Sequence, residues 1–210
     1  MKRTTRYLLG GVLAGGIFAA DRIAKSAVKK HVPEGKRMLL SPKTGRLVEV
    51  NHVRNYGMAR NAGESDPAAV RRLTTALTAG AGALFAAKPG PSTGLLLGGA
   101  AGNLLDRWQD GYVTDYLSFD LDDPELKDLS FNVADFGIFA GAGGLAAGAA
   151  LSDLHRQARR EYAASHDGEA PSAGRTALLA VQSVIRLPSR RNHRSHGTLQ
   201  RFTDLLQRRD

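Results

Sequence analysis

Four apolar blocks, separated by polar segments, form the main pattern of the chain. They run over residues 7–20, 73–87, 93–105 and 133–151. The first block continues in helical character through Asp21–Val28, which gives it about 20 residues, roughly the length that spans a bilayer. The other three are short for a bilayer about 30 Å thick, and Lys88-Pro89-Gly90-Pro91 predicts a tight turn between two of them. Apolar blocks with polar ends predict a four-helix membrane bundle.

Small residues recur four apart within these blocks. The pairs are Gly11 with Gly15, Gly94 with Gly98, Gly98 with Gly102, Gly137 with Gly141, and Gly144 with Gly148. This spacing lets helix backbones approach closely inside lipid. Alternatively, stretches rich in Ala and Gly reflect genomic composition alone and weaken each span. The four blocks together favour the bundle.

Two segments between the blocks predict short strands. Residues 46–53 read RLVEVNHV and residues 112–117 read YVTDYL, and both alternate as a strand does. The rest of the 31–67 segment is a polar loop with turn residues. In Asn55-Tyr56-Gly57 the glycine permits a close backbone approach or a positive φ. A small β element outside the bundle is therefore expected.

The start of the chain fits two interpretations. A short basic segment followed by an apolar core is also the pattern of a cleavable signal peptide. The helical continuation beyond residue 20 favours a membrane span instead. On that helix Asp21 and Lys25 are four residues apart and can pair, either as an ordinary ion pair at a helix end or as a brace between helices.

Basic residues at the two ends of the bundle predict its orientation. An even number of spans places both termini on one side of the membrane. Basic residues precede the first block (Lys2, Arg3 and Arg6) and follow the last (Arg156, Arg159 and Arg160). The positive-inside rule then predicts cytoplasmic termini. The basic residues of the 29–60 segment count against this orientation, because they would be translocated.

Charge and composition add two constraints. The formal charge of +9 indicates an anionic partner, either a nucleic acid or an anionic membrane surface. The mean hydropathy of −0.25 would argue against a membrane protein, but this average combines four apolar blocks with very polar loops and a polar tail. Cysteine is absent, which excludes disulfides, thiolate metal sites and cysteine nucleophiles.

Polar residues gather at the ends of the last two apolar blocks and between them. They are Asn103, Asp106, Arg107, Asp115, Asn132 and Asp135. Asp106 and Arg107 follow Asn103 by three and four residues, so the three share one face of a helix. An ionised carboxylate inside a bilayer costs about 2.5–3.5 kcal/mol, so such groups pair or function. Two carboxylates in a poorly solvated site share one proton, and one then acts as a base toward water while the other polarises a carbonyl.

The order DRIAK, NYG, GGAAGNLLDR, YVTDYL and FNVAD over residues 7–151 resembles lipoprotein signal peptidase, also called signal peptidase II. The resemblance implies an all-α, four-transmembrane-helix bundle with a small extracytoplasmic β element, in the bacterial cytoplasmic membrane. It implies an aspartyl endopeptidase inhibited by globomycin, which cleaves prolipoproteins just before the diacylglyceryl-modified cysteine. Neither a metal nor a cofactor is expected.

The same resemblance implies roles for individual residues. Asp115 and Asp135 would be the catalytic pair. Residues that contact the substrate or hold the pair would be Asn55, Gly57, Gly99, Asn103, Arg107 and Asn132. Asp21, Lys25 and Asp106 would brace the helices. From the residues alone, Asp106 ranks as high as Asp115.

Several positions depart from the family pattern. Arg60 stands where the family has an aromatic residue, and Asp128-Leu129-Ser130 stands where an apolar pair is common. The loop before FNVAD is acidic through Asp120, Asp122, Asp123, Glu125 and Asp128. Its spacing does not match a calcium-binding loop, so a solvated loop is expected. These departures bear on substrate range and efficiency.

Residues 152–210 form a basic tail beyond the family core of residues 1–151. Its first part is polar and is expected to be flexible, whereas residues 176–187 and 198–209 are amphipathic around a basic run at 190–194. Such a tail suits anionic headgroups of the cytoplasmic leaflet, and a disordered tail without a partner is the alternative. Nucleic acid is not expected, because aromatic residues do not interleave with the arginines. The alternative function is a non-catalytic membrane relative whose tail recruits anionic lipid or a partner protein.

Overall fold

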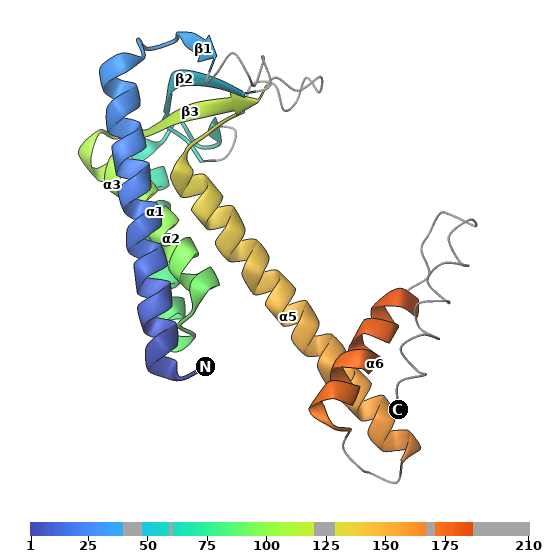
Figure 1. The fold of residues 1–210 in the computed structure, drawn as a ribbon. Coiled ribbons are helices and arrows are strands. Elements are labelled where there is room, and N and C mark those ends of the chain that lie inside the picture. The colour runs from blue at the N-terminus through green and yellow to red at the C-terminus, as the bar shows by residue number, and fades with distance from the viewer. Residues whose placement is uncertain (40–47, 59–60, 120–128, 167–170, 187–210) are drawn as a thin grey trace, which may run out of the picture. The chain divides into compact units, whose positions relative to one another are not determined.

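The computed structural model describes residues 1–39, 48–58, 61–119, 129–166 and 171–186 (Figure 1). It divides into two compact units, Met1–Ala147 and Gly148–Asp210. The functional motifs all lie in the first unit. The residue Arg60, the acidic loop from Asp120 to Asp128, and the tail segments 190–194 and 198–209 lie outside the described residues.

Each of the four apolar blocks is a helix. The helices are α1 (Arg3–His31), α2 (Pro67–Ala87), α3 (Pro91–Gln109) and α5 (Val133–Ser165). α3 packs against both α1 and α2. Among the described residues, two helices, α1 and α5, are long and apolar enough to cross a membrane.

Glycines of α3 allow its close contact with α1. A Cβ atom at Gly94 would overlap the backbone of Gly10, and one at Gly98 would stand 2.8 Å from the Cα of Ala14. The predicted close approach is therefore real on this face of α3. It is wrong for Gly11 and Gly15, because a Cβ there meets no described atom within 4 Å.

A four-stranded antiparallel sheet lies beside one end of the helices. Its strands follow the order β1 (Arg37–Leu39), β2 (Val48–Asn55), β3 (Val113–Phe119) and β4 (Ser130–Phe131). β2 and β3 correspond to the two alternating segments of the sequence. The fold is thus mostly helical with a small antiparallel sheet, which confirms the predicted helices and the predicted β element. Val28 of α1 and Val32, the residue that follows this helix, pack with Tyr116 of β3 in a shared core.

α5 extends beyond the predicted end of its apolar block. It continues to Ser165 rather than ending near Leu151. The expectation of a flexible chain from Ser152 is therefore wrong for the first part of the tail. Gln157 donates to Glu161 over 2.9 Å on this stretch, which is rich in strong helix formers. α6 (Ala173–Arg186) confirms the helix predicted near residues 176–187.

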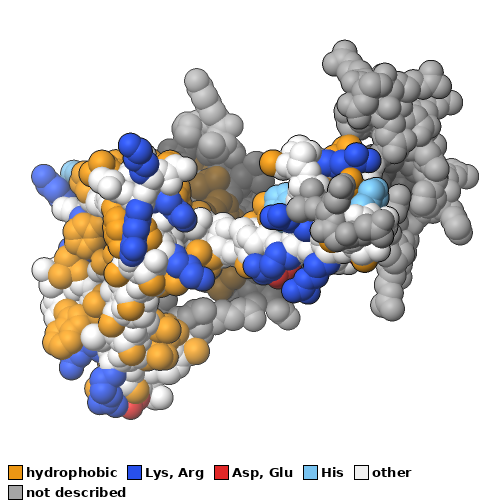
Figure 2. Space-filling view, turned by 90° about the horizontal axis from the view of Figure 1, so that it is seen from below, with side chains coloured by type: hydrophobic (Ala, Val, Ile, Leu, Met, Phe, Trp, Pro, Cys, Tyr) orange, Lys and Arg blue, Asp and Glu red, His pale blue; other side chains and the backbone are white. Residues whose placement is uncertain are grey.

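Large apolar side chains cover the outer surface of the helices, as Figure 2 shows for one face. Leu8 and Val12 of α1 are 66% and 70% exposed, and Phe139 of α5 is 58% exposed. Extended apolar surface of this kind marks a lipid or protein contact.

Candidate active site

The first turn of α5 is held by side chains from three different elements. The Asn132 and Asp135 side chains each accept the backbone N–H of the other, at 3.0 Å, so they cap the helix reciprocally. The Val133 N–H donates to the Tyr116 hydroxyl of β3 at 3.1 Å. The Ala134 N–H donates to Asp21 Oδ1 of α1 at 3.0 Å. The position of Asp135 is therefore fixed by both the sheet and α1.

Asp115 lies on β3, with its side chain turned into the same region. Asn132 Nδ2 donates to its Oδ1 at 2.6 Å and Asn55 Nδ2 donates to its Oδ2 at 2.9 Å. The residue is 4% exposed. Burial, together with the negative charge of Asp135, raises the pKa of Asp115 to about 7, against the opposing effect of the two amides. Asp115 therefore holds a proton below about pH 7.

The Asp135 carboxylate is also fully hydrogen-bonded. Asn103 Nδ2 donates to its Oδ1 at 2.8 Å, and the Asn132 N–H occupies its Oδ2. All four oxygens of Asp115 and Asp135 therefore accept an N–H. Three of these four donors are asparagine side chains, from β2, α3 and the start of α5.

Gly57 and Arg107 hold the Asn55 loop in place. The Gly57 N–H donates to Asn55 Oδ1 at 3.0 Å, and Arg107 Nη2 donates to the Gly57 carbonyl at 2.5 Å. A Cβ at Gly57 would stand 2.7 Å from the Cα of Asn61, so the glycine serves a close backbone approach. Arg107 Nε is buried and has no hydrogen-bond partner among the described atoms.

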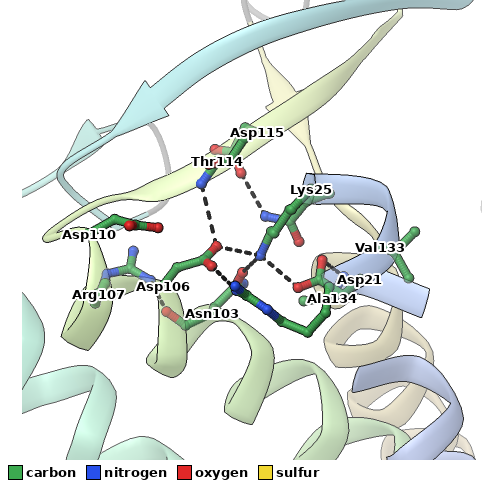
Figure 3. Close-up of polar contacts among 12 residues, drawn as sticks. Asp21, Lys25, Asn103, Asp106, Arg107, Asp110, Thr114, Asp115, Val133 and Ala134 are labelled. Atoms are coloured by element: carbon green, nitrogen blue, oxygen red, sulfur yellow. Dashed lines mark hydrogen bonds and ion pairs between the residues drawn. The ribbon is translucent and has the colours of Figure 1, made fainter. Parts of the chain in front are cut away.

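A cluster of four charged side chains lies near Asp115, and Figure 3 labels three of them, Asp21, Lys25 and Asp106. Lys25 Nζ lies 2.7 Å from Asp21 Oδ2 and 2.7 Å from Asp106 Oδ2, and Arg22 pairs with Asp106. Asp21, Lys25 and Asp106 are at most 1% exposed. The Thr114 N–H, next to Asp115, donates to Asp106 at 3.5 Å. This is a buried link between α1, α3 and β3, so the simpler interpretation of Asp21 and Lys25 as a helix-end pair is wrong.

Gly99 lies at the contact between α3 and α5. A Cβ there would overlap the Ala134 carbonyl and stand 3.0 Å from the Ile138 nitrogen. The glycine therefore lets α3 lie directly against the helix that carries Asp135. Gly99 therefore belongs to the contact between α3 and α5.

Asp115 and Asp135 line the same cavity, of about 430 Å³. Asn55, Asn103 and Arg107 contribute the other polar groups near the carboxyls. Sequence reasoning did not identify the apolar walls, which include Met58, Leu77, Ile138 and Phe139. The signal for the helical wall residues is weak, because every apolar block offers many such side chains. Tyr116 was also missed, although it is the next residue after Asp115.

Comparison with known proteins shows the family. The family model described as signal peptidase (SPase) II matches residues 13–151. The lipoprotein signal peptidase of Shewanella pealeana is 32% identical over 137 residues, which cover 60% of this chain and 77% of that protein. That of Tolumonas auensis is 33% identical over 132 residues, with 58% and 77% covered.

Solved structures show the same fold. One, titled as a bacterial membrane enzyme structure obtained by the in meso method at 2.3 Å resolution, matches with a TM-score of 0.56 and 19% identity, covering 63% of this chain and 82% of that chain. The matched region of the family model contains both carboxyls, the three asparagines and Arg107. The chain belongs to the signal peptidase II family.

Proposed function

We propose that this protein is a membrane aspartyl endopeptidase that cleaves the signal peptide from prolipoproteins just before the diacylglyceryl-modified cysteine. Asp115 and Asp135 form its catalytic dyad. The observation that carries this proposal is that both carboxyls line one cavity and are joined by Asn132, whose side-chain amide donates to Asp115 and whose backbone N–H donates to Asp135. Family membership supports the substrate class.

The surroundings of the two carboxyls support different roles for them. Asp135 lies in the first turn of α5 and accepts the Asn132 N–H, and the positive end of a helix dipole favours a carboxylate. Asp135 therefore serves as the base. Asp115, with its raised pKa, holds the proton and serves as the acid.

Cleavage then follows the usual course for two carboxyls. Asp135 takes a proton from water as the water oxygen attacks the scissile carbonyl carbon, and Asp115 gives its proton to the carbonyl oxygen. The tetrahedral intermediate collapses when Asp135 protonates the leaving cysteine nitrogen. Asp115 recovers a proton from the hydroxyl as the new carboxylic acid forms. Both residues return to their starting states, so each turnover consumes only water.

The rest of the cavity suits an extended, lipid-bearing substrate. Arg107 lines the same cavity and has an Nε without a hydrogen-bond partner among the described atoms, so its guanidinium is suited to donate to a substrate carbonyl. Leu77 and Phe139 offer apolar surface that is more than half exposed, next to the polar site. Acyl chains and the apolar core of a signal peptide match such walls.

We further propose that all four helices cross the membrane, with both termini in the cytoplasm. α2 and α3 have 21 and 19 residues, which at 1.5 Å per residue is about 30 Å. Arg3 and Arg6 of α1 line one surface hollow with Lys88 of the α2–α3 turn. Basic residues gathered at one end support placing that end inside. The dyad and the sheet would then face the outer leaflet.

The described part of the tail supports contact with anionic headgroups. Arg159 and Arg160 follow Arg156 by three and four residues on α5, and α6 is amphipathic. Each basic residue near an anionic surface contributes about 1 kcal/mol.

The complete set of dyad contacts favours the peptidase over a non-catalytic relative.

Complementation tests this function. We expect the chain to restore lipoprotein maturation in a bacterium that lacks its own lipoprotein signal peptidase, with globomycin blocking the rescue. The Asp110→Asn variant is the matched control, because Asp110 pairs with Lys29 at the surface, 2.6 Å away. Accumulation of uncleaved precursor with the wild-type chain, at normal expression in the membrane, would contradict the proposal.

A further inference from the structure

The side-chain amide of each asparagine around the dyad has a fixed orientation. Its oxygen accepts a hydrogen bond from a group other than the dyad carboxyls, which leaves its NH₂ group for those carboxyls. Asn55 Oδ1 accepts the Gly57 N–H and Asn132 Oδ1 accepts the Asp135 N–H. In both, a backbone N–H occupies the amide oxygen, which leaves the NH₂ group to face Asp115. Asn103 differs, because its Oδ1 accepts from the Lys25 ammonium at 3.0 Å.

Lys25 uses all three of its N–H donors inside the protein. Two go to Asp21 and Asp106, and the third goes to Asn103. The ammonium is 1% exposed, so water does not replace any of these contacts. Asp21 holds the first turn of α5 and Asp106 holds β3, so the two acids fix Lys25 against both elements that carry the dyad.

We propose that Lys25 is a positioning residue for the Asp115–Asp135 dyad, which acts by fixing the orientation of the Asn103 amide. The inference rests on the proposed peptidase mechanism. With its oxygen held by Lys25, Asn103 presents only its NH₂ group to Asp135, and this group stabilises the ionised base. With the amide reversed, two oxygens would face each other unless Asp135 carried a proton. The chain Lys25–Asn103–Asp135 thus keeps the base ionised.

A brace alone does not require this third contact. Asp106 also pairs with Arg22, and Asp21 also accepts the Ala134 N–H. The four charged side chains Asp21, Arg22, Lys25 and Asp106 carry no net charge together. Among the described residues of this cluster, Lys25 is the one that donates to a dyad-contacting amide. This amide is that of Asn103, which donates to Asp135.

The test is the pH profile of cleavage, with the full-length protein in micelles and a diacylglyceryl-modified prolipoprotein peptide as the substrate. The charged and titratable groups around the dyad, among the described residues, are Asp21 and Lys25 of α1, Asp106 and Arg107 of α3, and Tyr116 of β3. Removing Lys25 alone changes both the amide and the local charge. The double variant Lys25→Met/Asp21→Asn preserves the net charge, and the amide oxygen that it introduces at position 21 can still accept the Ala134 N–H.

We expect the double variant to lower kcat at least about 10-fold while KM stays within about 2-fold of the wild-type value. The pH below which the cleavage rate falls should rise by about one unit, because the ionised form of Asp135 loses a stabilising donor. Lys25→Arg, which keeps the charge and the donors, should restore the wild-type acid side. Lys29→Gln is the matched control, because Lys29 lies one turn further along α1 and pairs with Asp110. A folded double variant with the wild-type profile would overturn the positioning role.

Two further variants decide the remaining outcomes. If the double variant does not fold, Asn103→Leu removes the amide that links Lys25 to Asp135 without changing the charge, and it should show the same acid-side shift; an unchanged profile overturns the proposal. The Asp135→Asn variant distinguishes a failure of the peptidase mechanism from a failure of the positioning role. If it cleaves like the wild type, the peptidase mechanism fails and the positioning role fails with it. If Asp135→Asn is inactive and the Lys25→Met/Asp21→Asn variant has the wild-type pH profile, only the positioning role fails.

Discussion

At the scale of the residue, the site depends on amides whose oxygens are already occupied. The side-chain amides of Asn55, Asn103 and Asn132 each accept a hydrogen bond through their oxygen. Each also donates one through its NH₂ group to a carboxyl of the dyad. Four carboxylate oxygens in a buried site need such donors, since an unpaired buried charge costs several kcal/mol. The same arrangement keeps both carboxyls pointing into one cavity.

The pKa of Asp115 predicts how the rate depends on pH. The acid must hold its proton, and its pKa of about 7 means that it loses this proton as the pH rises through about 7. The cleavage rate at saturating substrate should therefore fall on the alkaline side of about pH 7. Initial rates measured in micelles from pH 5 to 9 check this. A rate that stayed constant up to pH 9 would exclude Asp115 as the acid.

Substitutions at Asn132 separate its capping role from its role toward Asp115. Asn132→Ala removes the cap of α5 and the donor to Asp115, so it should lower stability by about 0.5–2 kcal/mol and also abolish most activity. Asn132→Ser retains a capping oxygen but its side chain is too short to donate to Asp115. The serine variant should therefore restore the melting temperature but not cleavage. Equal recovery of both would place the role of Asn132 in the cap alone.

At the scale of the element, glycine faces decide which helices touch. Gly94 and Gly98 bring α3 against α1, and Gly99 brings it against α5. α3 therefore lies between the helix that carries Lys25 and the helix that carries Asp135. Its own Asn103 connects the two chemically.

Alanine substitutions should have opposite effects on the two glycine faces. Gly98→Ala places a methyl group against the Ala14 backbone and should destabilise the protein by about 1–3 kcal/mol. Gly15→Ala meets open space, so the higher helix propensity of alanine should leave stability unchanged or raise it by up to about 1 kcal/mol. Thermal unfolding in one detergent measures both. Equal destabilisation would mean that α1 and α3 are not packed through Gly98.

At the scale of the whole molecule, the sequence pattern identified most elements but not their contacts. The four apolar blocks predicted the helices, and alternation in RLVEVNHV and YVTDYL predicted β2 and β3. The end of α5 was missed, because polar residues such as Gln157 and Arg160 are equally good helix formers outside a membrane. The hydrogen bond from Lys25 to Asn103 joins residues 78 positions apart, which local patterns cannot predict.

The same limit applies to the site. Spacing alone ranked Asp106 with Asp115, and the family resemblance separated them. The structure adds the physical difference: Asp106 is paired with Lys25 and Arg22, whereas the described hydrogen-bond partners of the Asp115 carboxyl are neutral amides, and it lines the cavity. A buried acid without a cationic partner has a raised pKa, which suits Asp115 to proton transfer.

Removal of the part of the second unit that follows Ser165 tests whether this part contributes to catalysis. A chain that ends at Ser165 keeps every residue of the dyad network but loses α6 and the segment after it. We expect it to cleave substrate in micelles at nearly the wild-type rate. Its binding to vesicles containing anionic phospholipid should be weaker than that of the full chain. Lost cleavage in micelles would give the tail a part in the reaction.

Single-turnover cleavage of a diacylglyceryl-modified precursor by the Asp115→Asn and Asp135→Asn variants tests the dyad most directly. Both variants should be folded in detergent and should cleave at less than about one-thousandth of the wild-type rate, since each removes a group that transfers a proton in the transition state. Asp110→Asn should cleave normally. Wild-type cleavage by either folded dyad variant would contradict the assignment of Asp115 and Asp135 as the acid and the base.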